Sequence, residues 1–260
     1  MLLTAIRGAR SLLAFLLIGL WFLLWSPPLR LVVLPGARLF PRHRFLLVSA
    51  YMKVVCGGIL QLLRLGGARV RRSGRLPTAT PVVVVANHQS LVDICQVALL
   101  AHPRVPAFVA RRRYARFMPL ISACIRLLGC PIVDPRRDPP GAIEAVRRGA
   151  RELPHGLLIF PEGHRSVDGA VRPFRPAGLV AILRERRGPV YLVANDGVFQ
   201  VRRLADLLLR VHIIDARSEV MGPFEPPADD AQLPAFVAEL RRRLIDRLAG
   251  MRAEAGTPSA

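Results

Sequence analysis

Residues Val82–Asp93 read VVVVANHQSLVD and place a histidine directly after a strongly apolar run. Four consecutive valines are typical of a short strand that is buried on both faces of a sheet. The apolar run gives way at Asn87, and Ser90 stands where a helix is expected to begin. Open α/β sheets bind ligands at the carboxyl ends of their strands. The pattern therefore predicts that His88 lies at a ligand site.

An acidic residue, Asp93, follows five positions after His88. A carboxylate in the first helical turn can accept a hydrogen bond from one imidazole nitrogen, so that the other nitrogen takes a proton from a hydroxyl. The motif offers no serine or cysteine placed as a nucleophile, so the substrate hydroxyl would attack directly. The alternative is structural: Ser90–Asp93 also fits a capping box, and His88 could be a buried histidine bonded to backbone.

A second apolar strand, Leu157–Phe160, runs straight into Pro161–Ser166, which reads PEGHRS. Glycine lets backbone N–H groups approach an anion, and a guanidinium binds phosphate with two hydrogen bonds. Gly163 and Arg165 are thus candidate anion-binding residues. The alternative is a surface turn in which Glu162 and Arg165 form an ion pair of little energetic value.

Two further arginines, Arg111 and Arg136, each follow a short predicted strand and could enlarge the same positive pocket. Each also fits a solvated surface charge, because arginine is abundant throughout the chain.

Strands alternate with helices along most of the chain, which predicts an α/β domain with a central mixed, largely parallel sheet flanked by helices. This domain is expected to span residues 67–250, between an N-terminal anchoring region (1–66) and a disordered tail (251–260). The expected helices include Phe45–Leu65, Gly141–Glu152 and Pro234–Leu248. The expected strands include an edge strand at Ala68–Arg75, and Val190–Ala194 and Leu208–Ile214.

The N-terminal region is apolar enough to enter a membrane. Its uncharged stretch Ser11–Trp25 has 15 residues, short of the roughly 20 that span a bilayer as a helix, but snorkelling of Arg7 and Arg10 would extend it. A signal peptide is the alternative, yet no A-x-A-like site follows. We favour a retained anchor, spanning or re-entrant, with the rest of the chain on the cytoplasmic side because arginines cluster after it.

Composition favours a lipid partner over nucleic acid. The formal net charge is +20, which implies a polyanionic partner, and 52% of the residues are hydrophobic. Only three tyrosines and two tryptophans are present to stack on bases. The four cysteines form no C-x-x-C pair, so we expect reduced core thiols in a chain that faces a reducing compartment.

The two motifs together, N-H-x-S-x-x-D and then F-P-E-G-x-R-S, resemble those of the glycerolipid (lysophospholipid) acyltransferase family, typified by 1-acylglycerol-3-phosphate acyltransferases. The resemblance covers roughly residues 67–215. It implies that His88 is the general base and Asp93 its partner. It also implies a substrate-binding set, which consists of Glu162, Gly163, Arg165, Arg111 and Arg136.

The resemblance further implies transfer of a fatty acyl group from acyl-CoA or an acylated carrier protein to a lysophospholipid hydroxyl, with no bound cofactor. The simplest acceptor is 1-acylglycerol-3-phosphate, which yields phosphatidate. The expected location is the cytoplasmic face of a bacterial inner membrane.

Three departures from the family pattern leave the acceptor open: His164 replaces threonine, Pro135 precedes Arg136, and Leu192 replaces a second proline. A lyso-amino-acid lipid or another lysophospholipid is therefore an alternative acceptor. A non-catalytic lipid-binding protein is a further alternative. A metal-dependent hydrolase using His88, Asp93 and His164 would need more ligands than the sequence offers at suitable spacing.

Overall fold

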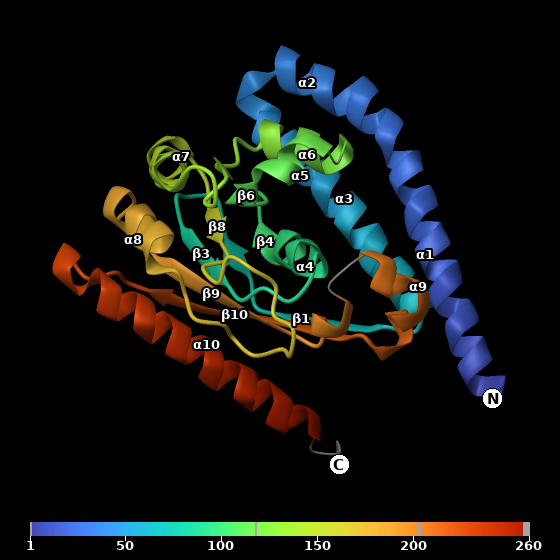
Figure 1. The fold of residues 1–260 in the computed structure, drawn as a ribbon. Helices are drawn as coiled ribbons and strands as arrows, with labels where there is room; N and C mark the ends of the chain where they lie inside the picture. Colours follow the sequence, from blue (N-terminus) through green and yellow to red (C-terminus); the bar gives the residue numbers. More distant parts are fainter. Residues whose placement is uncertain (1, 118, 202–203, 257–260) are drawn as a thin grey trace.

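The computed structural model describes residues 2–117, 119–201 and 204–256. In this part of the chain a six-stranded sheet has the order β1-β10-β9-β3-β8-β5 (Figure 1). Its strands are β1 (Arg69–Ser73), β3 (Val83–Ala86), β5 (Ala107–Phe108), β8 (Leu157–Ile159), β9 (Val190–Asp196) and β10 (Asp215–Phe224). The predicted mixed, largely parallel sheet with flanking helices is confirmed.

Strand β3 lies between β8 and β9 and runs parallel to both. All four residues of β3 are buried, as expected for β-branched side chains covered on both faces. Strand β8 is also parallel to β5, whereas β10 is antiparallel to β9 and β1 is parallel to β10. The carboxyl ends of β3 and β8 therefore meet at one sheet edge, and β1 and β10 begin at that same edge. Two small parallel pairs complete the strands: β2 (Leu76–Pro77) with β4 (Ala101–His102), and β6 (Ala110–Arg111) with β7 (Ile132–Val133).

Helices cover both faces of the sheet (Figure 1). On one side lie α8 (Pro176–Glu185) and α10 (Leu233–Gly256), with α7 (Pro139–Glu152) packed on α8; on the other lie α3 (Arg44–Leu65) and α4 (Val92–Leu100). The remaining helices are α5 (Arg112–Phe117), α6 (Pro119–Leu127) and α9 (Leu207–Arg210). Helix α10 buries a stripe at helical spacing, which consists of Leu233, Val237, Leu240, Leu244, Leu248 and Met251.

The N-terminal region forms two long helical segments. Helix α1 (Leu2–Pro28) continues through a π-helical turn (Leu29–Val33) into α2 (Leu34–Leu39), and a short 3₁₀ turn (Pro41–His43) leads into α3. Two segments, Ile6–Leu39 and Pro41–Leu65, are long and apolar enough to cross a membrane. The exposed face of α1 is lined by leucines, namely Leu12, Leu13, Leu16, Leu20, Leu23 and Leu24.

Helix α1 packs closely against α3 through its tryptophans. The Trp21 indole N–H donates to the Val55 carbonyl at 3.1 Å, and the Tyr51 hydroxyl donates to the Trp25 carbonyl at 2.8 Å. A Cβ atom at Gly58 would lie only 2.2 Å from the Trp21 ring. The absence of a side chain at Gly58 therefore makes room for the indole.

We expect Gly58→Ala to destabilise this packing by about 1–3 kcal/mol, because the new methyl group overlaps the Trp21 ring. The thermal unfolding midpoint of the purified chain in micelles would measure the loss. Gly57→Ala is the matched control, since nothing lies within 4 Å of a Cβ there. Equal midpoints for the two variants would contradict the expected clash.

The predicted strand Leu208–Ile214 is wrong. Leu207–Arg210 forms α9 and Val211–Ile213 a 3₁₀ turn, in keeping with the helical preference of consecutive leucines. The strand begins only at Asp215, in the polar segment DARSEVMGPF, which pairs with β9 on one side and β1 on the other. Tertiary pairing, not local apolar pattern, creates this strand.

Helix α10 also extends into the stretch that was predicted to be a disordered tail. Residues 251–256 are helical because Met251 continues the buried stripe and Arg252 binds Asp196 with Nε···Oδ2 at 2.9 Å. Residues 257–260 lie outside the described residues. At the other end of the domain, α3 ends at Leu65 and β1 begins at Arg69, and the predicted boundary after residue 66 stays a prediction.

Candidate active site

The loop between β3 and α4 is held in place by Asn87. Its side-chain amide donates to the Asn195 carbonyl at 2.7 Å, and its side-chain oxygen accepts the Asn195 N–H at the same distance. Asn195 lies in β9, so these reciprocal bonds fix the loop to the neighbouring strand. The residue after Asn87 is thereby held at the sheet edge.

His88 and Asp93 form the predicted contact, with Nδ1···Oδ2 at 2.8 Å. The same Asp93 oxygen accepts the backbone N–H groups of Gln89 at 2.6 Å and Ser90 at 2.8 Å. One carboxylate oxygen therefore both supports the start of α4 and orients the imidazole, so the structural and the chemical interpretations of Asp93 hold together. Nδ1 faces the carboxylate, which leaves Nε2 for a hydroxyl.

The surroundings of the His88 ring restrict its motion. The ring stacks on Phe160 with centroids 4.2 Å apart and an interplanar angle of 26°. The Asp93 side chain is fully buried, whereas 16% of the His88 side chain is exposed. The imidazole thus has one buried, charged partner and one open side, which suits a general base.

The buried side chain of Glu162, in the second sequence motif, is hydrogen-bonded to the backbone of the first motif. Its Oε1 accepts the backbone N–H of His88 at 2.8 Å, and its Oε2 accepts the backbone N–H of Arg172 at 2.8 Å. Burial raises the pKa of this carboxyl to about 7, although the two backbone hydrogen bonds oppose the rise. Both oxygens are engaged by the protein itself, and a contact of Glu162 with substrate stays a prediction.

A further link between the motifs is the Ser166 N–H, which donates to the His88 carbonyl at 2.7 Å. Between these links, Gly163 adopts φ +70°, a conformation that other residues rarely take, and its N–H donates to the Phe160 carbonyl at 3.1 Å. The Gly163 carbonyl accepts a hydrogen bond from Arg111. Gly163 therefore shapes the turn, and its predicted contact with an anion stays a prediction.

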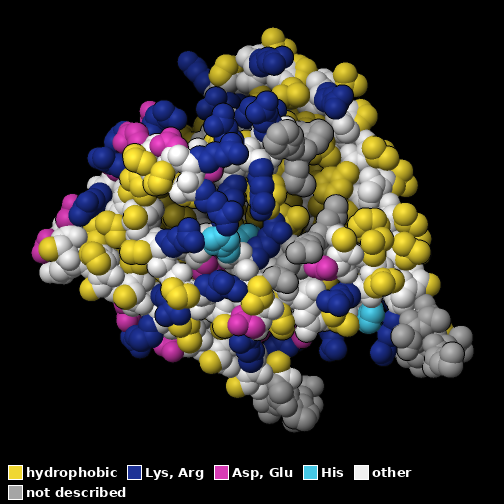
Figure 2. Space-filling view, viewed as in Figure 1, with side chains coloured by type: hydrophobic (Ala, Val, Ile, Leu, Met, Phe, Trp, Pro, Cys, Tyr) yellow, Lys and Arg dark blue, Asp and Glu magenta, His cyan; other side chains and the backbone are white. Residues whose placement is uncertain are grey.

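Arginines gather around this turn. Partial burial, followed by the charges of Arg113, Arg136 and Arg175, lowers the pKa of the Arg111 guanidinium. The pKa of His164 is also lowered, first by burial and then by Arg111 and Arg175. Figure 2 shows the result as a dense group of basic side chains around a histidine in the middle of this face. An anion bound here would relieve the mutual repulsion of these cations.

Tyr114, in α5, orders two of the guanidinium groups. Its hydroxyl accepts hydrogen bonds from Arg165 Nη2 at 3.0 Å and from Arg113 Nη2 at 2.9 Å. Neither sequence motif includes Tyr114, Arg113 or Arg175, and these residues were not predicted to belong to the site. The one local signal is a tyrosine inside an arginine run, RRRYAR, because an aromatic hydroxyl there can organise neighbouring charges.

The structure thus brings the predicted residues of both motifs to one edge of the sheet. Among the residues that the structure describes, no group of three His, Cys, Asp or Glu side chains could hold a metal ion. The four cysteines are free and buried.

A model of the family described as Acyltransferase matches residues 67–195. This stretch is just under half of the chain and includes both sequence motifs, so the chain resembles the family there. The chain is 31% identical over 134 residues to a 1-acyl-sn-glycerol-3-phosphate acyltransferase from Cocos nucifera, a match that covers 50% of this chain and 42% of that protein. It is 27% identical over 174 residues to a protein of the same name from Limnanthes alba, covering 63% of this chain and 59% of that one.

The fold of this chain is similar to the crystal structure of the 1-acyl-sn-glycerophosphate acyltransferase PlsC from Thermotoga maritima. The TM-score is 0.65 at 23% identity, over 90% of this chain and 97% of that chain. The matches to the two plant proteins span about half of their lengths. The family predicted from the two motifs is confirmed, and the structural similarity shows a shared fold.

Proposed function

We propose that this chain transfers a fatty acyl group from an acyl thioester to the free hydroxyl of a lysophospholipid, most simply 1-acylglycerol-3-phosphate. The observation that carries the proposal is the His88–Asp93 pair at 2.8 Å beside a group of arginines at the same sheet edge. A base and an anion site side by side suit an acceptor with both a hydroxyl and a phosphate. The names of the related plant proteins support this acceptor.

In the proposed reaction His88 Nε2 takes the proton from the acceptor hydroxyl as the oxygen attacks the thioester carbonyl. A C–O ester bond forms, the C–S bond breaks, and the leaving thiolate takes the proton back from the imidazolium. Asp93 stabilises the imidazolium through Nδ1, because its carboxylate is buried beside the ring. No covalent enzyme intermediate is required.

The acceptor phosphate would bind among Arg111, Arg136 and Arg165. Tyr114 orients Arg165, and the Gly163 carbonyl orients Arg111, so these two guanidinium groups are positioned before substrate arrives. Preorganised charge costs little to align at the moment of binding. The donor would be acyl-CoA or an acylated carrier protein, and we propose no bound cofactor.

The leucine-lined face of α1 supports placement of the protein on a membrane, where the lysophospholipid resides. We propose that the sheet edge with His88 faces the cytoplasm of a bacterial cell and works at its inner membrane. The donor thioester would then approach from water and the acceptor from the lipid surface.

The proposal is tested by acyl transfer from acyl-CoA to 1-acylglycerol-3-phosphate, with the purified chain in neutral micelles. We expect Arg165→Ala to raise the KM for the acceptor about tenfold, because a charge-assisted hydrogen bond to phosphate is lost. The KM for acyl-CoA should stay nearly unchanged. Arg148→Ala, which removes an exposed arginine of α7, is the control for net charge.

A rise in the donor KM alone would instead assign Arg165 to the acyl donor. A monoacylglycerol used as well as the phosphorylated acceptor would contradict the phosphate site. Comparison with other lysophospholipids and lyso-amino-acid lipids in the same assay would rank the alternative acceptors.

A further inference from the structure

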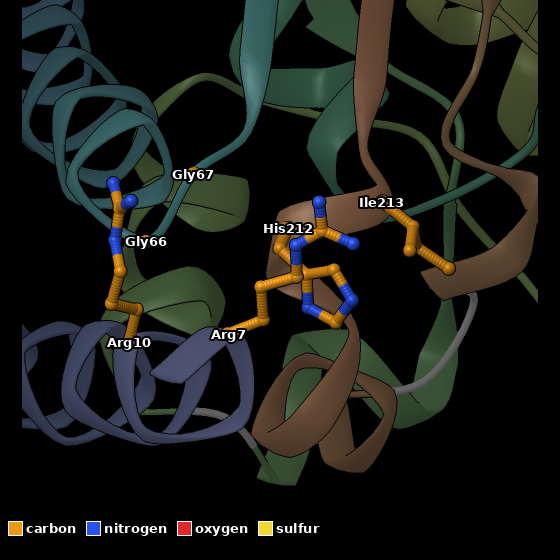
Figure 3. A pocket seen from close by; sticks show the side chains of 6 residues that line it. All are labelled: Arg7, Arg10, Gly66, Gly67, His212 and Ile213. Carbon is orange, nitrogen blue, oxygen red and sulfur yellow. The ribbon is translucent and has the colours of Figure 1, made fainter. Parts of the chain in front are cut away.

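A second positively charged cavity lies at the start of α1, away from the candidate active site (Figure 3). It has a volume of about 320 Å³ and is lined by Arg7, Arg10, Gly66, Gly67, His212 and Ile213. Figure 3 shows the two arginines rising from one helix, Arg7 toward His212 and Arg10 toward the Gly66–Gly67 turn. Three segments distant in sequence therefore build its walls.

The walls of this cavity are held close together by glycine. A Cβ atom at Gly66 would lie 2.5 Å from Val211 Cγ1 and 2.7 Å from Ala14 Cβ, so the end of α3 touches both α1 and the turn before β10. The Ser11 hydroxyl lies 3.2 Å from Nδ1 of His212, which fixes the imidazole against α1. The cavity is thus formed before any ligand binds.

The charged side chains that line the cavity, Arg7 and Arg10, are both positive. Arg7 is exposed, but it lies on the same face of α1 as Ser11, Ala14 and Ile18, which are buried. Arg10 donates to the Leu65 carbonyl at 3.1 Å, whereas no hydrogen bond or ion pair joins Arg7 to another residue in the described part of the chain. No acidic side chain lines the cavity. The Arg7 guanidinium therefore lines the cavity without a counter-charge from the described part of the chain.

We propose that this cavity is a second anion site, which binds a phosphate group. Arg7 would supply paired N–H donors, and Arg10 and the His212 ring would add further donors around the same anion. A phosphate group can come from an anionic phospholipid or from solution. The exposed leucines of α1, which begin at Leu12 and Leu13, place an acyl-chain surface beside the cavity and favour the lipid.

The topology of the sheet explains why such a site is useful. The cavity lies where β1 and β10 begin, and these strands begin at the edge where β3 ends. Strand β1 is three positions from β3, so the two strands are roughly 14 Å apart across the sheet at the usual strand spacing. A phospholipid held here would present this edge, and therefore His88, to the lipid surface.

The test records the NMR signal of the His212 ring as ligand is added. The sample is the full-length chain with labelled histidines in neutral micelles, and His212→Gln identifies which signal belongs to His212. Short-chain dihexanoyl-phosphatidylglycerol and inorganic phosphate are titrated separately. We expect a saturable shift, and Arg7→Ala should weaken binding about tenfold because paired charge-assisted bonds are lost. Arg7→Lys, which keeps the charge, should lose less. Arg38→Ala, an exposed arginine of α2 outside the cavity, is the control.

Tighter binding of the phospholipid than of inorganic phosphate would support a lipid headgroup site, and equal binding would support a site for the phosphate group alone. The proposal is overturned if neither ligand shifts the His212 signal saturably, or if Arg38→Ala weakens binding as much as Arg7→Ala. The His88 ring signal, recorded in the same spectra, separates this site from the candidate active site. The outcome is thereby independent of the proposed acyl transfer.

Discussion

Replacement of His88 by alanine is expected to lower kcat/KM for acyl transfer by about 10²–10⁴-fold, the usual contribution of a positioned general base. The imidazole of His88 contacts the buried Asp93 carboxylate through Nδ1, and Nε2 is left for the acceptor hydroxyl. Asp93 would keep its two backbone hydrogen bonds from Gln89 and Ser90, so the start of α4 should survive the change. Steady-state kinetics in micelles, with thermal unfolding of each variant alongside, would measure the effect.

His164→Ala is the matched control, because His164 lies in the neighbouring turn, where burial and then the surrounding arginines lower its pKa. No hydrogen bond or ion pair joins it to Asp93 in the described part of the chain. We expect its effect to be much smaller than that of His88→Ala. Unchanged turnover in His88→Ala would overturn the general-base role proposed for His88. Loss of activity on addition of a chelator would revive the metal-dependent hydrolase.

The second large effect is expected from Glu162→Gln, which should lower kcat about 10- to 100-fold. A glutamine offers one acceptor oxygen where two backbone N–H groups, those of His88 and Arg172, now donate. One N–H would face an amide donor, and an unsatisfied buried group costs about 1–3 kcal/mol. Because His88 itself is one of the donors, the ring would lose its exact placement. Glu152→Gln, an exposed acid of α7, is the control.

Glu162 also gives a pH signature that separates this positioning role from general damage. Its pKa is about 7 in the folded protein and 4.5 for an ordinary glutamate, so the folded state binds more protons between these values. The carboxyl therefore makes stability fall as pH rises from about 4.5 to about 7. Glu162→Gln should remove this slope, as measured by thermal unfolding across that range. An unaltered slope would show that another group is responsible.

Local patterns predicted the contact between His88 and Asp93, because the two residues lie within one strand end and the next helical turn. Because parallel strands end at the same edge of a sheet, the turn after Leu157–Phe160 was also predicted to lie at the edge that holds His88. In contrast, Tyr114 and Arg175 reach the site through packing of segments that no spacing in the sequence connects. The strand at Asp215–Phe224 escaped prediction for a related reason, since its polar residues become a strand only by pairing with β9 and β1.

Glu162 shows a different limit of the sequence. The family resemblance implied a contact of Glu162 with substrate, yet its two oxygens face the backbone of His88 and Arg172. The residue type is the same for either role, and only the direction of the side chain distinguishes them. The sequence motif alone does not give the direction in which the Glu162 side chain points.

The three donors on one Asp93 oxygen come from His88, Gln89 and Ser90, so one short stretch of chain positions the imidazole on its Nδ1 side. The arginines around it come from separate segments, among them those of Arg111, Arg136 and Arg165. Substitutions in one of these segments can therefore accumulate while the proton-transfer step is left intact. If the proposed function holds, a change among these arginines would alter which lipid is acylated and leave the His88–Asp93 pair in place.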